Sequence, residues 1–311
     1  MANNLTVTYK GSTIHTASAS GSATLETGGT WCEGDIGLNY EFDESIATLA
    51  VTVTNGTATS VVATKGSDIV SLSYSGGTWN TVLPSYGAWT VTITDGTHSN
   101  SATVNATQAG LYTVSIYMPD VPSGYTQLEW IEAPANRAYI DTGFKPNGNT
   151  KIICYAKTNR EVGTNSLYGA RNSSSSGMYQ FIPWVANSTN ATLYYGNQSA
   201  SATKIDTGVW YLVEQDHGVL RLNGAQVISI SNQSFTTNCN LLIWARNDNG
   251  TPGNYGHFCV AYFAIYDNGT LVRYYYPAIR KSDSVVGLYD VVNDVFYPSA
   301  GTGTFTAGPA V

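Results

Sequence analysis

Residues 89–117 read WTVTITDGTHSNSATVNATQAGLYTVSIY, and this segment decides the expected class of fold. Apolar and polar side chains alternate along WTVTIT, SATVNAT and LYTVSIY, which is the period of a strand with one buried face. Asp95-Gly96 separates the first two runs. Asp-Gly is a strong hairpin signal because both of its residues tolerate a positive φ. The segment therefore predicts antiparallel β-structure.

The same pattern extends outward over residues 44–118, where about seven short alternating runs are separated by turn residues. Asn55-Gly56 predicts a second hairpin there. Strands of this number and spacing favour an immunoglobulin-like or prealbumin-like sandwich. Trp79, Tyr86 and Trp89 are the expected core aromatics. Because titratable residues do not cluster in this region, we expect it to be a spacer domain.

Composition supports an all-β chain of more than one domain. The 311 residues include only 11% charged side chains, where a soluble domain usually has roughly 25%. This low charge content excludes coiled coils and long solvated helices. Gly, Tyr and Trp number 31, 22 and 7, which suits short strands joined by tight turns. The length predicts two or three domains.

Charge and hydropathy exclude two classes of partner. Residues 1–118 contain two basic and eight acidic side chains, and residues 119–311 contain twelve and thirteen. Neither part offers nucleic acid a basic face. The N-terminus lacks a charged region followed by an apolar one, and no apolar run approaches the ~20 residues of a spanning helix. We therefore expect neither a secretory signal nor membrane insertion.

The four cysteines are expected to be buried free thiols. Cys32 lies far from Cys154, Cys239 and Cys259 in the sequence, and no pair has C-x-x-C spacing. A large core does not need disulfides, and free cysteine is among the residues most often buried.

Four segments are predicted along the chain. Residues 1–43 form a small β module, which has little surface to bury by itself and is expected to be an attachment element. Residues 44–118 form the spacer domain. Residues 119–126 contain two prolines, which lack the amide hydrogen that a strand ladder needs, and are expected to be a linker. Residues 127–311 suit one larger sandwich.

The C-terminal region resembles a known family on four ordered segments. They are LEWIEAPANRAYIDTGFKPNGNT (128–150), LYGAR (167–171), LLIWARNDNG (241–250) and the run from FAIYDNG to FTAGP (263–309). These segments are similar to the concanavalin A-like/laminin G-like domains of tail and fibre proteins of phages of gut bacteria, and of surface proteins of those bacteria. The resemblance implies two antiparallel sheets packed face to face in a jelly-roll-like sandwich.

The upstream part resembles phage structural proteins as well. TLETGGTWCEGDIGLNY (24–40) looks like an N-terminal module common in phage and prophage proteins, and residues 83–117 look like a spacer domain of the same proteins. The resemblance implies a virion protein that assembles in the host cytoplasm and attaches to other virion proteins through its N-terminal module. Symmetric positions in a virion favour a homo-oligomer, a dimer or a trimer.

A glycosidase is the main enzymatic alternative, because glucanases share the sandwich and retaining enzymes need two carboxyl groups ~5–5.5 Å apart. Glu214 and Asp216 would project from one face of a strand. Val219, however, stands where the glucanase pattern Glu-x-Asp-x-x-Glu has its last Glu. Glu129 and Glu132 are three apart and would face opposite sides of a strand. We therefore expect no enzyme.

Histidine and metal chemistry are not favoured either. The four histidines lie near Gly-rich or Thr-rich turns and no Gly-x-Ser-x-Gly elbow is present, so a Ser-His-Asp site is not expected. Asp248, between Asn247 and Asn249, is a weak Ca²⁺ candidate, since oxygen-rich loops suit this ion and some relatives in the wider laminin G fold bind it. The same residues are also typical of a plain turn.

Glycan binding fits the composition best, because sugars present apolar ring faces to aromatics and hydroxyls to polar anchors. The candidate residues are Trp184, Trp244, Arg246, Asn247, Tyr168 and Arg171, and the other aromatics of this region are Tyr179, Tyr194, Tyr195 and Tyr255. The function that we expect is a non-enzymatic phage structural protein, on the tail or as a head fibre or decoration protein, whose lectin-like domain binds host-surface or mucin glycans. A structural decoration protein without glycan binding, a glycan-cleaving enzyme and a bacterial surface adhesin are the alternatives.

Overall fold

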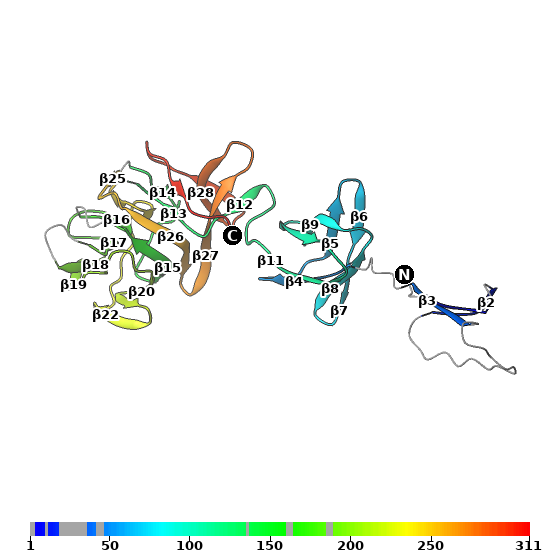
Figure 1. Ribbon diagram of the computed structural model, residues 1–311. Helices are drawn as coiled ribbons and strands as arrows, with labels where there is room; N and C mark the ends of the chain where they lie inside the picture. Colours follow the sequence, from blue (N-terminus) through cyan, green and yellow to red (C-terminus); the bar gives the residue numbers. More distant parts are fainter. Residues whose placement is uncertain are drawn as a thin grey trace. The chain divides into compact units, whose positions relative to one another are not determined.

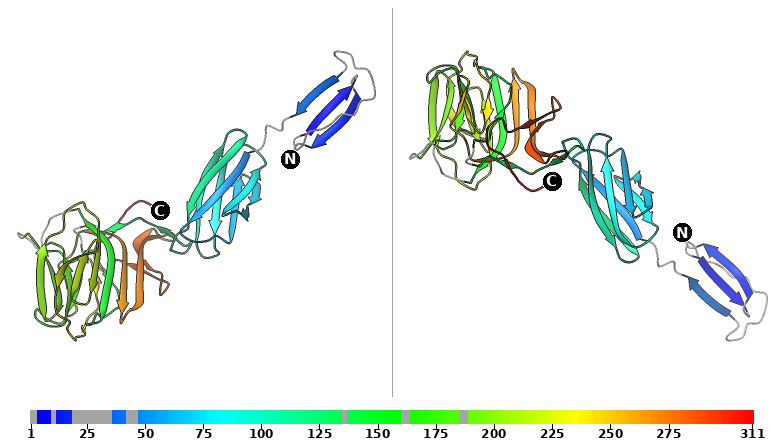
Figure 2. Two further views of the ribbon diagram at one scale, coloured as in Figure 1. Left: turned by 90° about the horizontal axis from the view of Figure 1, so that it is seen from below. Right: turned by 90° about the horizontal axis from the view of Figure 1, so that it is seen from above.

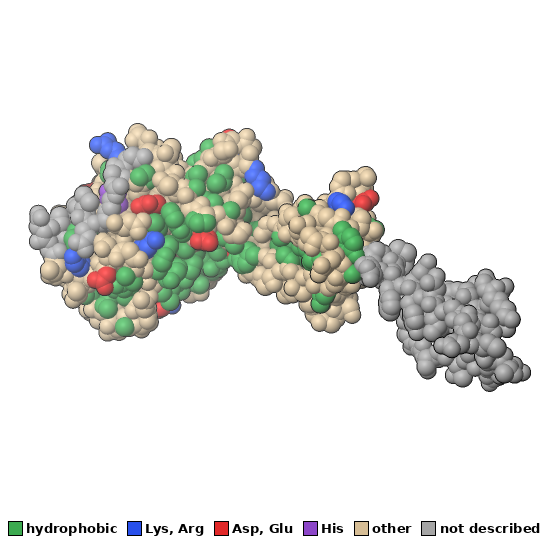
Figure 3. All heavy atoms as spheres, viewed as in Figure 1, with side chains coloured by type: hydrophobic (Ala, Val, Ile, Leu, Met, Phe, Trp, Pro, Cys, Tyr) green, Lys and Arg blue, Asp and Glu red, His purple; other side chains and the backbone are tan. Residues whose placement is uncertain are grey.

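The computed structural model describes residues 4–9, 12–18, 36–41, 47–134, 137–159, 164–184 and 189–311, with side chains from residue 47 onward (Figure 1). All regular elements in these ranges are β-strands, so the prediction of an all-β chain is confirmed. Within them, no helix is long and apolar enough to cross a membrane. The chain divides into two compact units, residues 1–118 and 119–311. Charged side chains are sparse on the drawn face of each, as the composition predicts (Figure 3).

The first unit begins with three antiparallel strands. They are β1 (Asn4–Tyr9), β2 (Ser12–Ser18) and β3 (Ile36–Glu41), in the order β2-β1-β3. Val7 of β1 is paired with His15 of β2 and with Leu38 of β3. Cys32 lies outside the described residues. The attachment role of residues 1–43 stays a prediction.

Residues 47–117 form eight strands in two four-stranded sheets. The strands are β4 (Ala47–Thr54), β5 (Ser60–Lys65), β6 (Asp68–Ser71), β7 (Ser73–Ser75), β8 (Thr78–Leu83), β9 (Gly87–Thr94), β10 (Ser99–Ala106) and β11 (Gly110–Tyr117). One sheet has the order β10-β9-β5-β6 and the other β11-β4-β8-β7. Alternate side chains of both sheets share one core, in which Leu49, Trp89 and Ile93 are fully buried. Trp79 and Tyr86, the other two expected core aromatics, pack at its margin.

Four connections in this region join strands of different sheets, namely β4–β5, β6–β7, β8–β9 and β10–β11. Asn55 and Gly56 have the expected positive φ, 57° and 125°, but β4 and β5 belong to different sheets. The predicted hairpin there is therefore wrong, because the turn carries the chain across the sandwich and Asn55 Nδ2 donates to Met118 O at 2.9 Å. The run SDIVSLSY is likewise divided at the buried Leu72 into β6 and β7 of opposite sheets. The hairpin at Asp95-Gly96 is confirmed.

The second unit consists of nineteen strands in the described residues. They are β12 (Tyr125–Gln127), β13 (Ile131–Glu132), β14 (Ile140–Asp141), β15 (Thr150–Thr158), β16 (Tyr168–Arg171), β17 (Met178–Ile182), β18 (Asn190–Gly196), β19 (Gln198–Thr203), β20 (Tyr211–Asp216), β21 (Val219–Leu222), β22 (Ala225–Ser229), β23 (Leu242–Ile243), β24 (Arg246–Asp248), β25 (Thr251–Gly253), β26 (Phe258–Asp267), β27 (Thr270–Arg280), β28 (Val285–Asp290), β29 (Val295–Pro298) and β30 (Thr306–Ala307).

These strands form two large sheets that enclose one core (Figure 2). The eleven-stranded sheet has the central order β22-β21-β20-β15-β26-β27-β28-β29 and also contains β12, β13 and β30. The eight-stranded sheet has the order β14-β23-β16-β17-β18-β19, with β24 and β25 at β16. Pairing is antiparallel except between β16 and β24. The two-sheet sandwich expected of this region is thus the observed arrangement.

Burial alternates strictly along β15, at the centre of the larger sheet. Ile152, Cys154 and Ala156 face the core, and Tyr155 and Lys157 face outward. Full burial raises the pKa of the Cys154 thiol well above its ordinary value, which keeps it in the neutral form. The three cysteines of the described ranges, Cys154, Cys239 and Cys259, are all buried and free, as the sequence predicts for them.

The segment expected to be a linker packs against the second unit. Val121 is buried with Ala278 and Tyr289, and Asp120 accepts a hydrogen bond from Gln127 Nε2 at 3.0 Å. Lys281 Nζ donates to Ser123 O at 2.8 Å. Residues 119–126 are therefore held by apolar burial and hydrogen bonds to the sheet that follows them.

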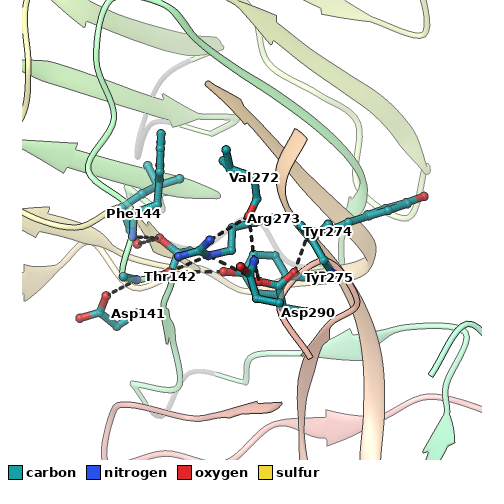
Figure 4. Close-up of polar contacts among 12 residues, drawn as sticks. Asp141, Thr142, Phe144, Val272, Arg273, Tyr274, Tyr275 and Asp290 are labelled. Atoms are coloured by element: carbon teal, nitrogen blue, oxygen red, sulfur yellow. Dashed lines mark hydrogen bonds and ion pairs between the residues drawn. The ribbon is translucent and has the colours of Figure 1, made fainter. Parts of the chain in front are cut away.

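A buried polar network joins the two sheets of this unit (Figure 4). The Asp290 carboxylate, fully buried, accepts hydrogen bonds from the backbone of Tyr274 and Val292 at 3.1 Å and lies 3.4 Å from Arg273 Nε. Arg273 Nε also donates to Thr142 O at 3.4 Å, just after β14 of the other sheet. The charge of Asp290 is thus paired and fully hydrogen-bonded, the condition for burying a carboxylate without a large cost.

We predict that Asp290→Ala destabilises the second unit by about 3 kcal/mol, because it removes the carboxylate that pairs with Arg273 and takes the acceptor from the backbone amides of Tyr274 and Val292. Urea unfolding of the full chain measures the loss. Asp283→Ala is the matched control, since Asp283 also pairs with an arginine, at 2.7 Å, but at the surface. Surface pairs contribute little, so this variant should unfold like the wild type. Equal losses in both variants would contradict the role assigned to Asp290.

A second prediction concerns the β9–β10 turn. Hydrogen bonds from the His98 backbone and ring, and from the Thr97 backbone, lower the pKa of Asp95 from 3.8 to about 2. The ionised carboxylate therefore adds stability above pH 3.8, and this contribution disappears as the pH falls through 2. Asp95→Ala should cost roughly 1–2 kcal/mol at pH 7 and almost nothing at pH 2, measured by urea unfolding at both values. Asp68→Ala, at the exposed first residue of β6, is the control. If Asp95→Ala lowered the free energy of unfolding equally at both pH values, the stabilising role of the ionised Asp95 carboxylate would be refuted.

Candidate functional site

The outer face of the eight-stranded sheet brings together three of the charged residues singled out in the sequence. Parallel pairing of β16 with β24 places Arg171 beside Asp248, and Arg246 projects from the same face of β24. Arg171 binds both Asp248 oxygens, with Nε to Oδ1 at 2.9 Å and Nη2 to Oδ2 at 2.5 Å. Arg246 Nη2 donates to Oδ2 at 3.1 Å. We call these three residues the arginine cluster.

Gly169 provides the space for this cluster. A Cβ at this position would lie 2.9 Å from Gln180 Cγ and 3.3 Å from Arg246 Cβ, so a side chain there would displace both. Burial and the neighbouring Arg171 lower the pKa of Arg246, while the hydrogen bond from Arg171 lowers the pKa of Asp248. The buried Arg246 Nε has no hydrogen-bond partner among the described residues. The cluster is therefore partly buried and contains two guanidinium groups but only one carboxylate.

The cluster does not have the form of a cation site. Both Asp248 oxygens already accept hydrogen bonds from Arg171, and the Asn247 side chain is used within the protein, with Oδ1 bound to Gly250 N at 2.8 Å and Nδ2 to Asn240 O at 3.0 Å. No group of three or more His, Cys, Asp or Glu side chains that could hold a metal ion occurs in the described part of the chain. The Asn247 side chain thus stabilises the β24–β25 turn, and the Asp248 carboxylate pairs with the two arginines.

The aromatic candidates lie mainly in the core. Tyr168 and Trp244 are fully buried; the Tyr168 hydroxyl donates to Gln215 Oε1 at 2.8 Å, and Trp244 Nε1 donates to Phe258 O at 2.6 Å. Trp184 is 8% exposed, and Lys204 Nζ lies 3.6 Å from the centroid of its ring. A ligand cannot reach the first two rings, and Lys204 lies over the third. Of the other aromatics, Tyr179 and Tyr195 are also buried, whereas Tyr194 and Tyr255 are half-buried.

A row of half-buried aromatic rings occupies the outer face of the eleven-stranded sheet. We call it the aromatic face, and it consists of Trp210, Tyr155, Tyr262, Tyr274 and Tyr276. Tyr155 and Tyr262 are directly paired between β15 and β26, and Tyr274 lies on β27, the next strand. Figure 3 shows hydrophobic side chains gathered over β15, β26 and β27. The row therefore runs across the strands of the sheet.

Each ring of the row contacts the next. Tyr155 stacks on Trp210 with centroids 5.0 Å apart and on Tyr262 at 6.2 Å, at interplanar angles of 21° and 22°. Tyr274 meets Tyr262 edge-on at 6.1 Å and contacts Tyr276 at 4.8 Å. These separations are those of favourable aromatic pairs. The rings thus hold one another in fixed orientations at the surface.

A cation lies at one end of the aromatic face. Lys157 Nζ is 4.9 Å from the ring centroid of Trp210 and 5.7 Å from that of Trp130. Both distances fall within the range of cation–π attraction. Gly308 leaves room for Trp130, since a Cβ there would be 2.6 Å from the indole. Lys157 therefore supplies a positioned hydrogen-bond donor between two indoles.

The glucanase-like carboxylates project from the same outer face, on β20. Glu214 Oε1 lies 2.7 Å from Lys151 Nζ and Asp216 Oδ2 lies 3.7 Å from it, so one lysine bridges both. The hydrogen bond to Glu214 raises the pKa of Lys151, which keeps the bridge charged at neutral pH. The turn expected at residues 216–218 is present, with His217 at φ 54°. A protonated lysine therefore lies between the two groups that a retaining glycosidase would use.

The histidines whose side chains the structure describes have local partners. His98 Nδ1 lies 2.7 Å from Asp95 and His217 Nδ1 lies 2.6 Å from Asp216, both within hairpin turns. His257 is buried. None of these contacts brings a serine hydroxyl to an imidazole.

The aromatic face was not among the sites predicted from the sequence. A signal for it is present in TKIICYAKT, where alternation places Lys151, Tyr155 and Lys157 on the face opposite Cys154. The positions of Tyr262 and Tyr274 depend on the pairing register of strands far apart in the chain, which the alternation within one strand does not give.

Comparison with known proteins identifies no family. No family model matches the chain, and no curated protein matches it. Among solved structures, one similar chain is a "putative carbohydrate binding protein" from Bacteroides ovatus ATCC 8483, with 12% sequence identity and a TM-score of 0.41 over 87% of this chain and 95% of that one.

Proposed function

We propose that the protein is a non-enzymatic glycan-binding protein and that the aromatic face of its second unit holds the carbohydrate. The observation that carries this proposal is the continuous row of five half-buried rings across β15, β26 and β27. A pyranose presents an apolar C–H face to an aromatic side chain and hydroxyls to nearby polar groups. Surface rings that are already fixed by one another lose little conformational entropy when a ligand stacks on them.

The length of the row favours an extended oligosaccharide as the ligand, and not a single sugar. Four successive ring contacts, with centroids 4.8–6.2 Å apart, run from Trp210 to Tyr276. The row crosses three strands, whose spacing is roughly 4.8 Å. Polar groups border it, with Lys157 at one end and the Lys151–Glu214 pair, which joins β15 to the neighbouring β20. A linear or branched oligosaccharide can use the whole row.

The carboxylate pair supports binding over hydrolysis. A retaining mechanism needs one protonated carboxyl group and one free carboxylate facing the glycosidic bond. In this protein Lys151 bridges Glu214 and Asp216. The Lys151 ammonium group therefore occupies the space between the two carboxylates.

We further propose that the protein is displayed on a phage virion, as a tail or head fibre or a decoration protein, and is a homo-oligomer attached through residues 1–43. The support is the sequence resemblance of residues 24–40 and 83–117 to phage structural proteins. Immunogold labelling with antibodies against the full chain should mark purified virions produced by a strain that carries the gene. Labelling of intact bacterial surfaces in place of virions would overturn this assignment in favour of an adhesin.

The glycan proposal predicts that Trp210→Ala and Tyr262→Ala each weaken binding at least tenfold, because aromatic rings that pack on a ligand contribute roughly 1.4–2 kcal/mol or more. The measurement is full-chain binding to an array of bacterial-surface and mucin glycans, followed by titration of the best ligand. Tyr194→Ala is the matched control, since it removes a half-buried tyrosine from the outer face of the other sheet. It should bind like the wild type.

Three outcomes would contradict the proposal in different ways. Loss of binding in Tyr194→Ala and Arg171→Ala, with Trp210→Ala intact, would move the site to the arginine cluster. No binding to any glycan would favour a structural decoration protein. Release of shortened oligosaccharides by the wild type but not by Glu214→Gln would establish a glycosidase.

A further inference from the structure

The first unit contains a pocket that its expected role as a spacer does not require. It has a volume of about 350 Å³ and lies where the end of β4, the β4–β5 turn and the β7–β8 hairpin meet. Its lining residues are Val53, Gly56, Thr57, Ala58, Tyr74, Gly77 and Trp79. This volume is within the range of small-molecule sites.

Two aromatic rings form one wall of this pocket. Tyr74 and Trp79 are directly paired between β7 and β8, and their ring centroids lie 5.3 Å apart at an angle of 53°. Trp79 packs against the core of the sandwich, whereas Tyr74 is 63% exposed. The wall therefore has an inner ring, Trp79, that is fixed by the core and an outer ring, Tyr74, that solvent reaches. Tyrosine is more often partly buried than exposed to this extent.

The other side of the pocket is formed by backbone. Gly56 and Gly77 have φ of 125° and 87°, a conformation that side chains other than glycine strain to adopt. A Cβ at Gly77 would meet nothing within 4 Å, so this position opens on free space. The Thr57 residue and the peptide groups of these glycines add hydrogen-bonding atoms to the lining of the pocket.

The lining indicates the chemistry of the ligand. Apolar rings on one side and peptide and hydroxyl groups on the other suit an amphipathic ring. Among the described residues, no ionisable group other than the Tyr74 phenol lines the pocket. Residues 1–118 have six more acidic than basic side chains, which disfavours an anion. We propose that this pocket binds one neutral pyranose ring, stacked on Tyr74 and Trp79. The first unit then has a sugar site of its own, independent of the aromatic face.

The test uses the full chain carrying Trp210→Ala and Tyr262→Ala, so that the result does not depend on the aromatic face. The probes are methyl β-glucopyranoside, methyl β-galactopyranoside and N-acetylglucosamine, observed by saturation-transfer difference NMR. At least one probe should give ring-proton signals, and Tyr74→Ala should reduce them at least fivefold. The ring of Tyr74 is mostly exposed, so its removal should leave the circular dichroism spectrum unchanged.

Ile69→Ala is the matched control, because Ile69 is a 72% exposed apolar residue on β6 of the same unit. It should leave the signals at the level of the parent chain. Signals that survive Tyr74→Ala, or fall equally in Ile69→Ala, would overturn the proposal. So would silence with all three sugars, and binding of N-acetyltryptophanamide alone would identify the pocket as a docking site for a protein side chain instead.

Discussion

The shared core of the C-terminal sandwich determines which side chains can meet a ligand. Along β15 the residues Ile152, Cys154 and Ala156 must face the other sheet, because only there can their apolar surface leave water. Side chains alternate between the two faces of a strand, so the residues between these three face outward. Tyr155 and Lys157 are at the surface for this reason. The aromatic face is thus a consequence of the same alternation that builds the core.

Much of the fold could be predicted because alternation and turn chemistry are local. WTVTIT and SATVNAT form β9 and β10 around the expected Asp95-Gly96 turn. The errors occur where a local signal does not specify the partner strand. Asn55-Gly56 adopts the expected positive φ values, but its flanking strands belong to different sheets. Long-range packing in the core that contains Leu49 and Trp89 determines this arrangement. A turn signal gives the backbone conformation of a turn, while the tertiary core decides which sheet the next strand joins.

The candidate site could be predicted less well, because aromatic residues have the same sequence signature in a core and at a surface. Trp244 and Trp210 both stand in apolar surroundings in the sequence, yet Trp244 is fully buried and Trp210 is half-buried beside Tyr155. The charged candidates could be predicted only in part. The gathering of Arg171, Arg246 and Asp248 on one face follows from the pairing of β16 with β24, and their proximity was foreseeable only for the two that are neighbours in sequence.

The physical difference between the two outer faces favours the rings as the place for a glycan. In the arginine cluster Arg171 already makes two hydrogen bonds to Asp248, so a sugar hydroxyl that binds Arg171 would have to replace a charge-assisted bond with a neutral one. Arg246 Nε, which has no partner among the described residues, is buried. On the aromatic face a ligand displaces only water from half-exposed rings, which is favourable for apolar surface. The polar groups of the ligand can then contact Lys157, whose ammonium group lies near the two indoles. Among the described residues, no carboxylate lies within salt-bridge distance of Lys157. Binding there adds interactions without breaking any that the fold requires.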